Sequence, residues 1–265
     1  FMKAANTDPD PYVRGMFGLH AAFTLSQASL ETCVEAASGV PGGFHVHTAE
    51  GPGDEVDSYR QYKRPIVQRF AELDMLSAES LFIHLVHVSN REMELLQTSG
   101  AWAVHNPYSN MGNAVGTARV AELLHRGVPM GLGTDAYTSD MLASLGLAKV
   151  LMSSSLEDPT VGFMQSVELL FGNNPRIASH FFGAGLGALK AGNYADVITL
   201  DYHPHTRFDA NSMWGHVIFG LSGGLVNDTM CGGRWLMRDR VLLTLDEARS
   251  DARSTERAAE IWKHM

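Results

Sequence analysis

The stretch Gly43-Phe44-His45-Val46-His47-Thr48-Ala49-Glu50 has the alternating pattern of a short buried strand. Because side chains alternate between the two faces of a strand, His45 and His47 share one face. Glu50 follows where the strand should give way to a turn at residues 51–53. Imidazole is the commonest metal ligand, and a carboxylate at a strand end can move a proton. An ordinary buried or half-exposed histidine pair would give the same pattern. Residues on the neighbouring strands are therefore needed to distinguish a metal site from a structural pair.

The composition indicates a folded protein with a sizeable core. The chain has 265 residues, of which 45% are hydrophobic and 18% charged, which suits one large or two modest domains. The net charge of −9 argues against nucleic acid or an anionic membrane surface as the main partner. Only Cys33 and Cys231 are present, so we expect no disulfide framework and a cytoplasmic location.

Two further observations concern targeting and the start of the chain. No apolar run approaches the roughly 18–20 residues of a membrane span, so we expect no membrane partner. Residues 1–6 lack the apolar core of a signal peptide. The chain begins with Phe1 rather than Met, so we expect it to be the cut edge of a longer protein.

Strand and helix patterns alternate along residues 1–184. Near-continuous apolar strands are expected near residues 20, 45, 83, 103 and 131, the third of them over residues 80–87. Amphipathic helices are expected between them, with a polar stretch at residues 54–60 and a loop at 108–116. This alternation is typical of a parallel sheet with crossover helices. The predicted strands end in polar residues: His20, His47, His84, His105 and Asp135.

The pattern changes after residue 184. Helices at about residues 141–154, 161–171 and 175–182 give way to short strands at 195–201, 229–231 and 234–237. A charged amphipathic helix is expected over residues 245–265. We therefore divide the chain into a partial (β/α) barrel, residues 1–184, and a small β-rich unit with a terminal helix, residues 185–265.

Four residues at strand ends could together carry metal-dependent chemistry: His47, Glu50, His84 and Asp135. A divalent metal held by imidazoles and a carboxylate lowers the pKa of bound water to about 7. Asp135 could accept the proton of that water, and Glu50 could pass one to a leaving group. Taken alone, His84 is compatible with a buried structural histidine and Asp135 with a helix cap. Their occurrence on successive strand ends favours a shared site.

Longer motifs surround these residues in a fixed order. They are His47-Thr48-Ala49-Glu50, His84, His105-Asn106-Pro107-Tyr108-Ser109-Asn110-Met111 and Gly133-Thr134-Asp135. The series resembles the amidohydrolase superfamily, in the branch that contains guanine deaminase, S-adenosylhomocysteine deaminase and the triazine chlorohydrolases. The resemblance continues through Gly215-His216-Val217-Ile218-Phe219-Gly220 and so covers essentially the whole chain.

The resemblance implies the C-terminal part of a (β/α)8 TIM-like barrel, strands four to eight, with a small β-rich composite domain. It also implies roles for individual residues. His47, His84 and Asp135 would bind the metal, zinc or alternatively iron. Glu50 would be the proton shuttle, with His84 and Asp135 also catalytic. His20 and Asn110 would contact the substrate.

One family feature has no counterpart in this chain. The superfamily carries a His-x-His metal pair on its first strand, and His203-Pro204-His205 lies in the β-rich tail instead. We therefore expect this chain to lack strands one to three of the parent barrel.

The expected function of the parent enzyme is hydrolysis of a non-peptide C–N bond. Metal-bound hydroxide would deaminate a nitrogen heterocycle, and the partner would be a small molecule. Dechlorination of a triazine ring is an alternative. A further alternative is a non-catalytic fragment or assembly subunit. The substrate, the metal and a homo-oligomeric state are left open.

Overall fold

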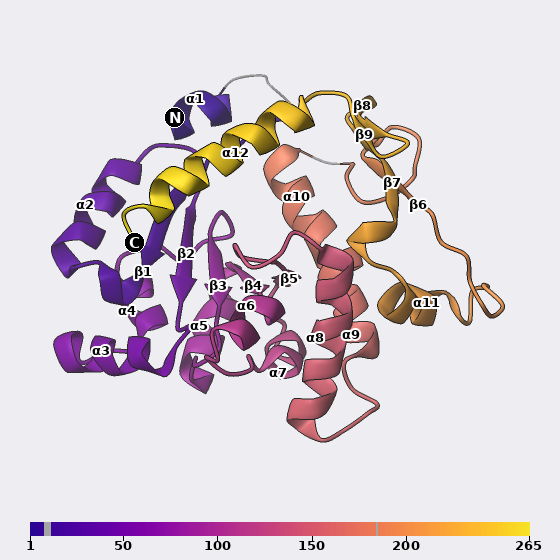
Figure 1. Ribbon diagram of the computed structural model, residues 1–265. Helices are drawn as coiled ribbons and strands as arrows, with labels where there is room; N and C mark the ends of the chain where they lie inside the picture. Colours follow the sequence, from indigo (N-terminus) through magenta and orange to yellow (C-terminus); the bar gives the residue numbers. More distant parts are fainter. Residues whose placement is uncertain (8–11, 184) are drawn as a thin grey trace.

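Five strands form one parallel sheet in the order β1-β2-β3-β4-β5 (Figure 1). The computed structural model describes residues 1–7, 12–183 and 185–265. Each strand pairs in parallel with the next one along the chain, so all five carboxyl ends lie at the same edge. The strands are β1 (Phe17–Ala21), β2 (Phe44–Thr48), β3 (Leu81–His84), β4 (Trp102–His105) and β5 (Met130–Leu132). All five lie where the sequence predicted them.

Helices make every connection between these strands. The N-terminal part of the chain holds α1 (Met2–Thr7), η1 (Ala22–Thr24), α2 (Gln27–Ala37), α3 (Pro52–Tyr62), α4 (Ile66–Glu72), α5 (Asn90–Ser99), α6 (Pro107–Gly112) and α7 (Val120–His125). Their apolar faces bury the core against the sheet. The rings of Phe70 on α4 and Phe82 on β3 lie 5.7 Å apart, and both side chains are fully buried. Burying one such side chain contributes about 1.5–3 kcal/mol.

Two connecting stretches contain helices that were not expected. The polar stretch at residues 54–60 lies inside α3, which begins with Pro52 at its first helical position. The loop expected at residues 108–116 contains α6, which also starts on a proline, Pro107. Both helices are polar and lack the apolar stripe from which a helix is usually predicted. Short helices of this kind depend on tertiary contacts for their stability. A third helix, α11 (Met213–Gly220), was not predicted.

The strand expected over residues 80–87 is shorter than predicted. It ends at His84 because His84 and Leu85 have positive φ angles of 76° and 53°, which no strand continues through. This early end turns the chain at the edge of the sheet where the polar residues collect.

Side-chain amides satisfy the outer edge of β5. Beyond α8 (Met141–Leu156), the segments α9 (Phe163–Val167), η2 (Glu168–Asn173, a π-helix) and α10 (Asn174–Phe182) follow one another without a break. Asn174 donates to the Leu132 carbonyl and accepts from the Leu132 N–H, each at 2.9 Å. Asn173 donates to the Met130 carbonyl at 2.8 Å. The two amides therefore occupy the place of a neighbouring strand. Gly131 permits this, since a Cβ there would collide with the Asn174 side chain.

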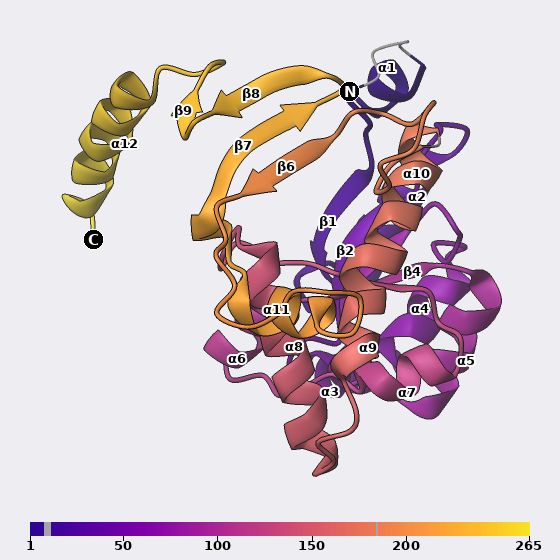
Figure 2. The ribbon, with the colours of Figure 1, turned by 90° about the vertical axis from the view of Figure 1, so that its right-hand side faces the viewer.

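A second, antiparallel sheet lies after residue 185, in the order β6-β7-β8-β9. Its parts are β6 (Val197–Leu200), α11, η3 (Gly223–Leu225), β7 (Val226–Cys231), β8 (Arg234–Arg238), β9 (Val241–Leu242) and α12 (Glu247–Trp262). Figure 2 shows α12 standing clear of the parallel sheet, and none of its residues is buried. The domain boundary at residue 184 stays a prediction. None of the described helices is long and apolar enough to cross a membrane.

A buried glutamate, Glu92, and a partly buried one, Glu55, meet where α3, α4 and α5 pack together. Glu92 accepts from the Val67 N–H at 3.0 Å, and Glu55 accepts from the Ile66 N–H at 3.4 Å. The other oxygen of Glu55 has almost no exposed surface. Burial, followed by the negative charge of Glu92, raises the pKa of Glu55 to about 8. Glu55 is therefore largely protonated at neutral pH.

The free energy of unfolding should depend on pH through this group. Folded Glu55 keeps a proton that the unfolded chain releases, so its stabilisation is complete below its ordinary pKa and is lost as the pH rises through about 8. Glu55→Gln keeps the size without the charge. We expect the free energy of unfolding in urea to become more favourable for the variant, relative to the native protein, as the pH rises from about 5 to about 9. Glu35→Gln, on the exposed side of α2, is the control. If the difference in free energy of unfolding between Glu55→Gln and the native protein stays constant over this pH range, the raised pKa of Glu55 is contradicted.

Candidate active site

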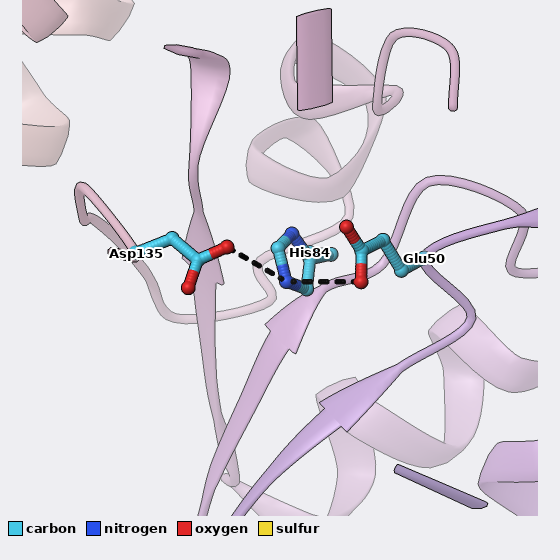
Figure 3. A group of neighbouring side chains, drawn as sticks. All are labelled: Glu50, His84 and Asp135. Atoms are coloured by element: carbon cyan, nitrogen blue, oxygen red, sulfur yellow. Dashed lines mark ion pairs between the residues drawn. The ribbon is translucent and has the colours of Figure 1, made fainter. Parts of the chain in front are cut away.

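Three side chains from different strand ends converge at the carboxyl edge of the parallel sheet. Nε2 of His84 lies 3.5 Å from Oε2 of Glu50 and 3.8 Å from Oδ2 of Asp135 (Figure 3). One ligand atom from each of the three residues can be chosen so that all lie within 4.8 Å of one another. His84 is fully buried, whereas the two carboxylates are about a quarter exposed. The group thus joins a buried imidazole to two acids that solvent can reach.

Two more imidazoles lie beside this group. The ring of His47 is centred 5.2 Å from that of His84 and 5.6 Å from that of His20. Burial and the neighbouring His84 lower the pKa of His47, while Asp135 and Glu50 act in the opposite direction. The structure therefore brings His20, His47, Glu50, His84 and Asp135 into one cluster. Their individual roles stay predictions.

The backbone at the site is held in an uncommon conformation. Ala49, His84 and Asp135 all have positive φ angles, of 50°, 76° and 55°. Non-glycine residues rarely adopt this region, at a cost on the order of 1–3 kcal/mol each. All three lie where a strand ends, and each turn directs a polar side chain toward the centre of the edge. Strain concentrated in this way is a frequent property of functional sites.

Helix α6 and its C-terminal cap residue, Asn113, supply a hydrogen-bond partner to each of the three converging residues. Ser109 donates to Oδ2 of Asp135 at 2.6 Å. Asn113 donates to Oε1 of Glu50 at 3.2 Å and to the Ser109 hydroxyl at 3.3 Å. Oδ1 of Asn110 lies 2.7 Å from Nδ1 of His84. Three neutral side chains, two on α6 and one at its C-terminal cap, thus hold both acids and the imidazole.

The motif around Ser109 was expected to shape the site, but the hydrogen bonds of Ser109 to Asp135 and of Asn113 to Glu50 were not predicted. The available signal was a cluster of Ser and Asn directly after a strand that ends at this edge, but we expected a loop there. Asn110 was expected to contact substrate. The structure leaves its side chain no exposed surface and places it against His84.

Several opposing effects determine the pKa of Asp135. Burial tends to raise the pKa of Asp135. The Ser109 hydroxyl, the Ala136 N–H and the nearby imidazoles outweigh it, so the pKa is lowered overall. Asp135 is therefore ionised and able to bind a cation or accept a proton. The position of Glu50 is set through its backbone: Asp54 on α3 accepts from the Glu50 N–H at 3.0 Å.

One strand-end histidine does not join the cluster of polar contacts. His105 is buried, and neither ring nitrogen has a hydrogen-bond partner among the residues that the structure describes. Burial, with a smaller effect of His84, lowers its pKa to about 4. His105 is therefore neutral and enclosed at neutral pH.

The donor atoms suit a divalent metal. Nε2 of His84 is buried and has no hydrogen-bond partner among the described residues, yet two carboxylates face it. An imidazole nitrogen with carboxylate oxygens is a donor set that zinc accepts. The geometric group contains Glu50 where the sequence predicted His47 as a ligand. His84 and Asp135 belong to both sets.

Comparison with known proteins identifies the class. Residues 2–236 match the model of the amidohydrolase family, so the chain belongs to this family, as its motifs predicted. A curated relative, the 5-methylthioadenosine/S-adenosylhomocysteine deaminase of Dictyoglomus thermophilum, is 28% identical over 267 residues, covering 99% of this chain and 62% of the relative. The 5'-deoxyadenosine deaminase of Methanosarcina mazei is 30% identical, covering 98% and 61%. The chain thus spans about three fifths of the length of these relatives.

Solved structures share the fold. A zinc-bound adenosine deaminase from Xanthomonas campestris superposes with a TM-score of 0.86 at 22% identity, over 96% of this chain and 59% of that one. The atrazine chlorohydrolase TrzN from Arthrobacter aurescens, complexed with zinc, gives 0.77 at 19% identity, over 95% and 56%. The predicted fold class is confirmed.

Proposed function

We propose that this chain holds the catalytic residues of a metal-dependent aminohydrolase that deaminates an adenine-type ring. The observation that carries the proposal is the convergence of Glu50, His84 and Asp135 at the carboxyl edge of the sheet. The curated relatives named above are deaminases of adenosine-type compounds, which supports the substrate class. We further propose a small-molecule partner and a cytoplasmic location.

The proposed metal is zinc, bound by His47, His84 and Asp135. Zinc when bound supplies a Lewis acid that makes water a nucleophile near neutral pH. The buried, unpartnered Nε2 of His84 and the ionised Asp135 support these two residues as ligands. Zinc in the neighbouring deaminase structure favours zinc over iron.

The chain's own residues would move the protons. As the water oxygen bonds to the ring carbon, Asp135 takes one water proton, and Glu50 gives a proton to the adjacent ring nitrogen. The carbon–amine bond then breaks, and the proton held by Asp135 leaves with the amine as ammonia. The remaining hydroxyl proton returns to Glu50, which restores the starting state. His84 orients the water from its buried position.

Ammonia release tests the proposal. The full chain is incubated with zinc and either 5'-deoxyadenosine, S-adenosylhomocysteine or a chlorinated triazine, and ammonia and chloride are measured. Ammonia from the adenosine-type compounds is the expected result. Chloride alone would favour a triazine chlorohydrolase. A chain without product or bound metal would favour the non-catalytic alternative.

Removal of the metal should abolish the activity reversibly. After dialysis against a chelator we expect deamination to fall below about 1% of the starting rate, because water loses the activation that a metal provides. Added zinc should restore it. Circular dichroism before and after dialysis is the control for unfolding. Full activity in a sample shown to be free of metal would contradict the proposal.

A further inference from the structure

His84 has two ring nitrogens in opposite surroundings. Nδ1 lies 2.7 Å from Oδ1 of Asn110. Nε2 faces the carboxylates of Glu50 and Asp135 at 3.5 and 3.8 Å and has no hydrogen-bond partner among the described residues. A neutral imidazole carries one hydrogen, and which nitrogen bears it decides what the other can do. An amide oxygen only accepts, so the hydrogen that it meets belongs to Nδ1.

The fold gives Asn110 little freedom to do anything else. Its side chain is fully buried and cannot reach a molecule in the open part of the site. Its backbone N–H donates to the Asn106 carbonyl at 3.0 Å, and its backbone carbonyl accepts from the Val115 N–H at 3.1 Å. These bonds hold the backbone of Asn110 in place. The amide is held behind the imidazole, on the side away from the two acids.

We propose that Asn110 is a positioning residue that keeps the hydrogen of His84 on Nδ1, so that the Nε2 lone pair stays directed toward Glu50 and Asp135. The proposal rests on the proposed function in one respect: a lone pair at Nε2 is what a metal or the proton of a water requires there. The opposite tautomer would put an N–H between the two acids. That N–H would donate to the two carboxylates, and Nε2 would then have no lone pair to bind a cation or accept a proton from water.

The hydrogen-bond partner of Asn110 distinguishes it from Ser109 and Asn113. Ser109 and Asn113 bind carboxylates, which accept hydrogen bonds in every ionised state. Asn110 alone binds a side chain that has two neutral forms. Outer partners of this kind typically change metal affinity or activity about 10–100-fold when they are removed. The substrate should bind almost unchanged, because Asn110 does not reach the open part of the site.

Nitrogen NMR of the full chain tests the tautomer without any need for activity. In ¹⁵N-histidine-labelled protein, the His84 signals are identified by their loss in His84→Gln. We expect a one-bond N–H coupling at Nδ1 and none at Nε2. Asn110→Leu, of similar shape but without the amide, should lose this preference. Asn110→Asp restores an acceptor and should recover it. An N–H at Nε2 in the native protein would overturn the proposal, whether or not the protein deaminates anything.

Kinetics supply the second measurement. With an active substrate, Asn110→Leu should lower kcat about 10–100-fold with KM within about threefold, and Asn110→Asp should regain most of the loss. Asn90→Leu, an exposed position at the start of α5, controls for the substitution itself. A preserved Nδ1 hydrogen in Asn110→Leu would overturn the role of Asn110. If Asn110→Leu fails to fold, the native and Asn110→Asp spectra still decide the tautomer.

Discussion

Asp135→Asn is expected to lower kcat about 10²–10⁴-fold, the range that positioned acid–base groups usually contribute. The substitution keeps the size of the side chain and leaves one oxygen to accept from Ser109 or from the Ala136 N–H, the two bonds that now hold the carboxylate. It removes the negative charge that would bind the metal and take the proton of water. The loss should therefore appear in turnover rather than in folding.

Initial rates and metal content of Asp135→Asn should be compared with those of Asp251→Asn. Asp251 lies on α12, where no residue is buried, so this control removes an equal charge far from the site. We expect bound zinc to fall in Asp135→Asn and to stay unchanged in the control. Activity within a few-fold of the native value would rule out the proposed role of Asp135.

Glu50→Gln is expected to slow deamination strongly while retaining the metal. Glutamine still offers an oxygen to Asn113, which now donates to Oε1 of Glu50, but it cannot supply a proton to a ring nitrogen. We expect kcat to fall about 10²–10⁴-fold. His47→Ala should instead lose the metal, because it removes a proposed ligand. Zinc measured by mass spectrometry after gel filtration, together with the rate, separates the two variants.

This pair of variants also decides between two ligand sets. The atoms of Glu50, His84 and Asp135 are grouped closely enough to bind an ion, whereas the motifs imply His47 in place of Glu50. Loss of zinc in Glu50→Gln with retention in His47→Ala would make Glu50 a ligand and remove its proposed role as the proton carrier.

Much of the fold followed from local patterns. Alternation in residues 44–48 and apolar runs elsewhere predicted five strands, and all five are present. Local patterns worked less well for α3 and α6. Their sequences are polar and contain no apolar stripe from which a helix could be predicted. Asp54, which was read as part of a polar stretch, turned out to fix the backbone of Glu50 from α3.

The sequence by itself determined which residue types stand at the strand ends, because alternation and the ends of apolar runs are encoded within a few neighbouring positions. His47, Glu50, His84 and Asp135 could be singled out on that basis. Only the tertiary structure decided what these residues touch. The parallel register places β2 beside β3, and positive φ angles turn His84 and Asp135 inward. Asn113 meets Glu50 across 63 positions of sequence, and Ser109 meets Asp135 across 26. Contacts over such separations depend on how the strands and helices pack, which no local pattern contains. The candidate residues on the strand ends could therefore be predicted from the sequence, whereas the contacts that Ser109, Asn110 and Asn113 make with them could not.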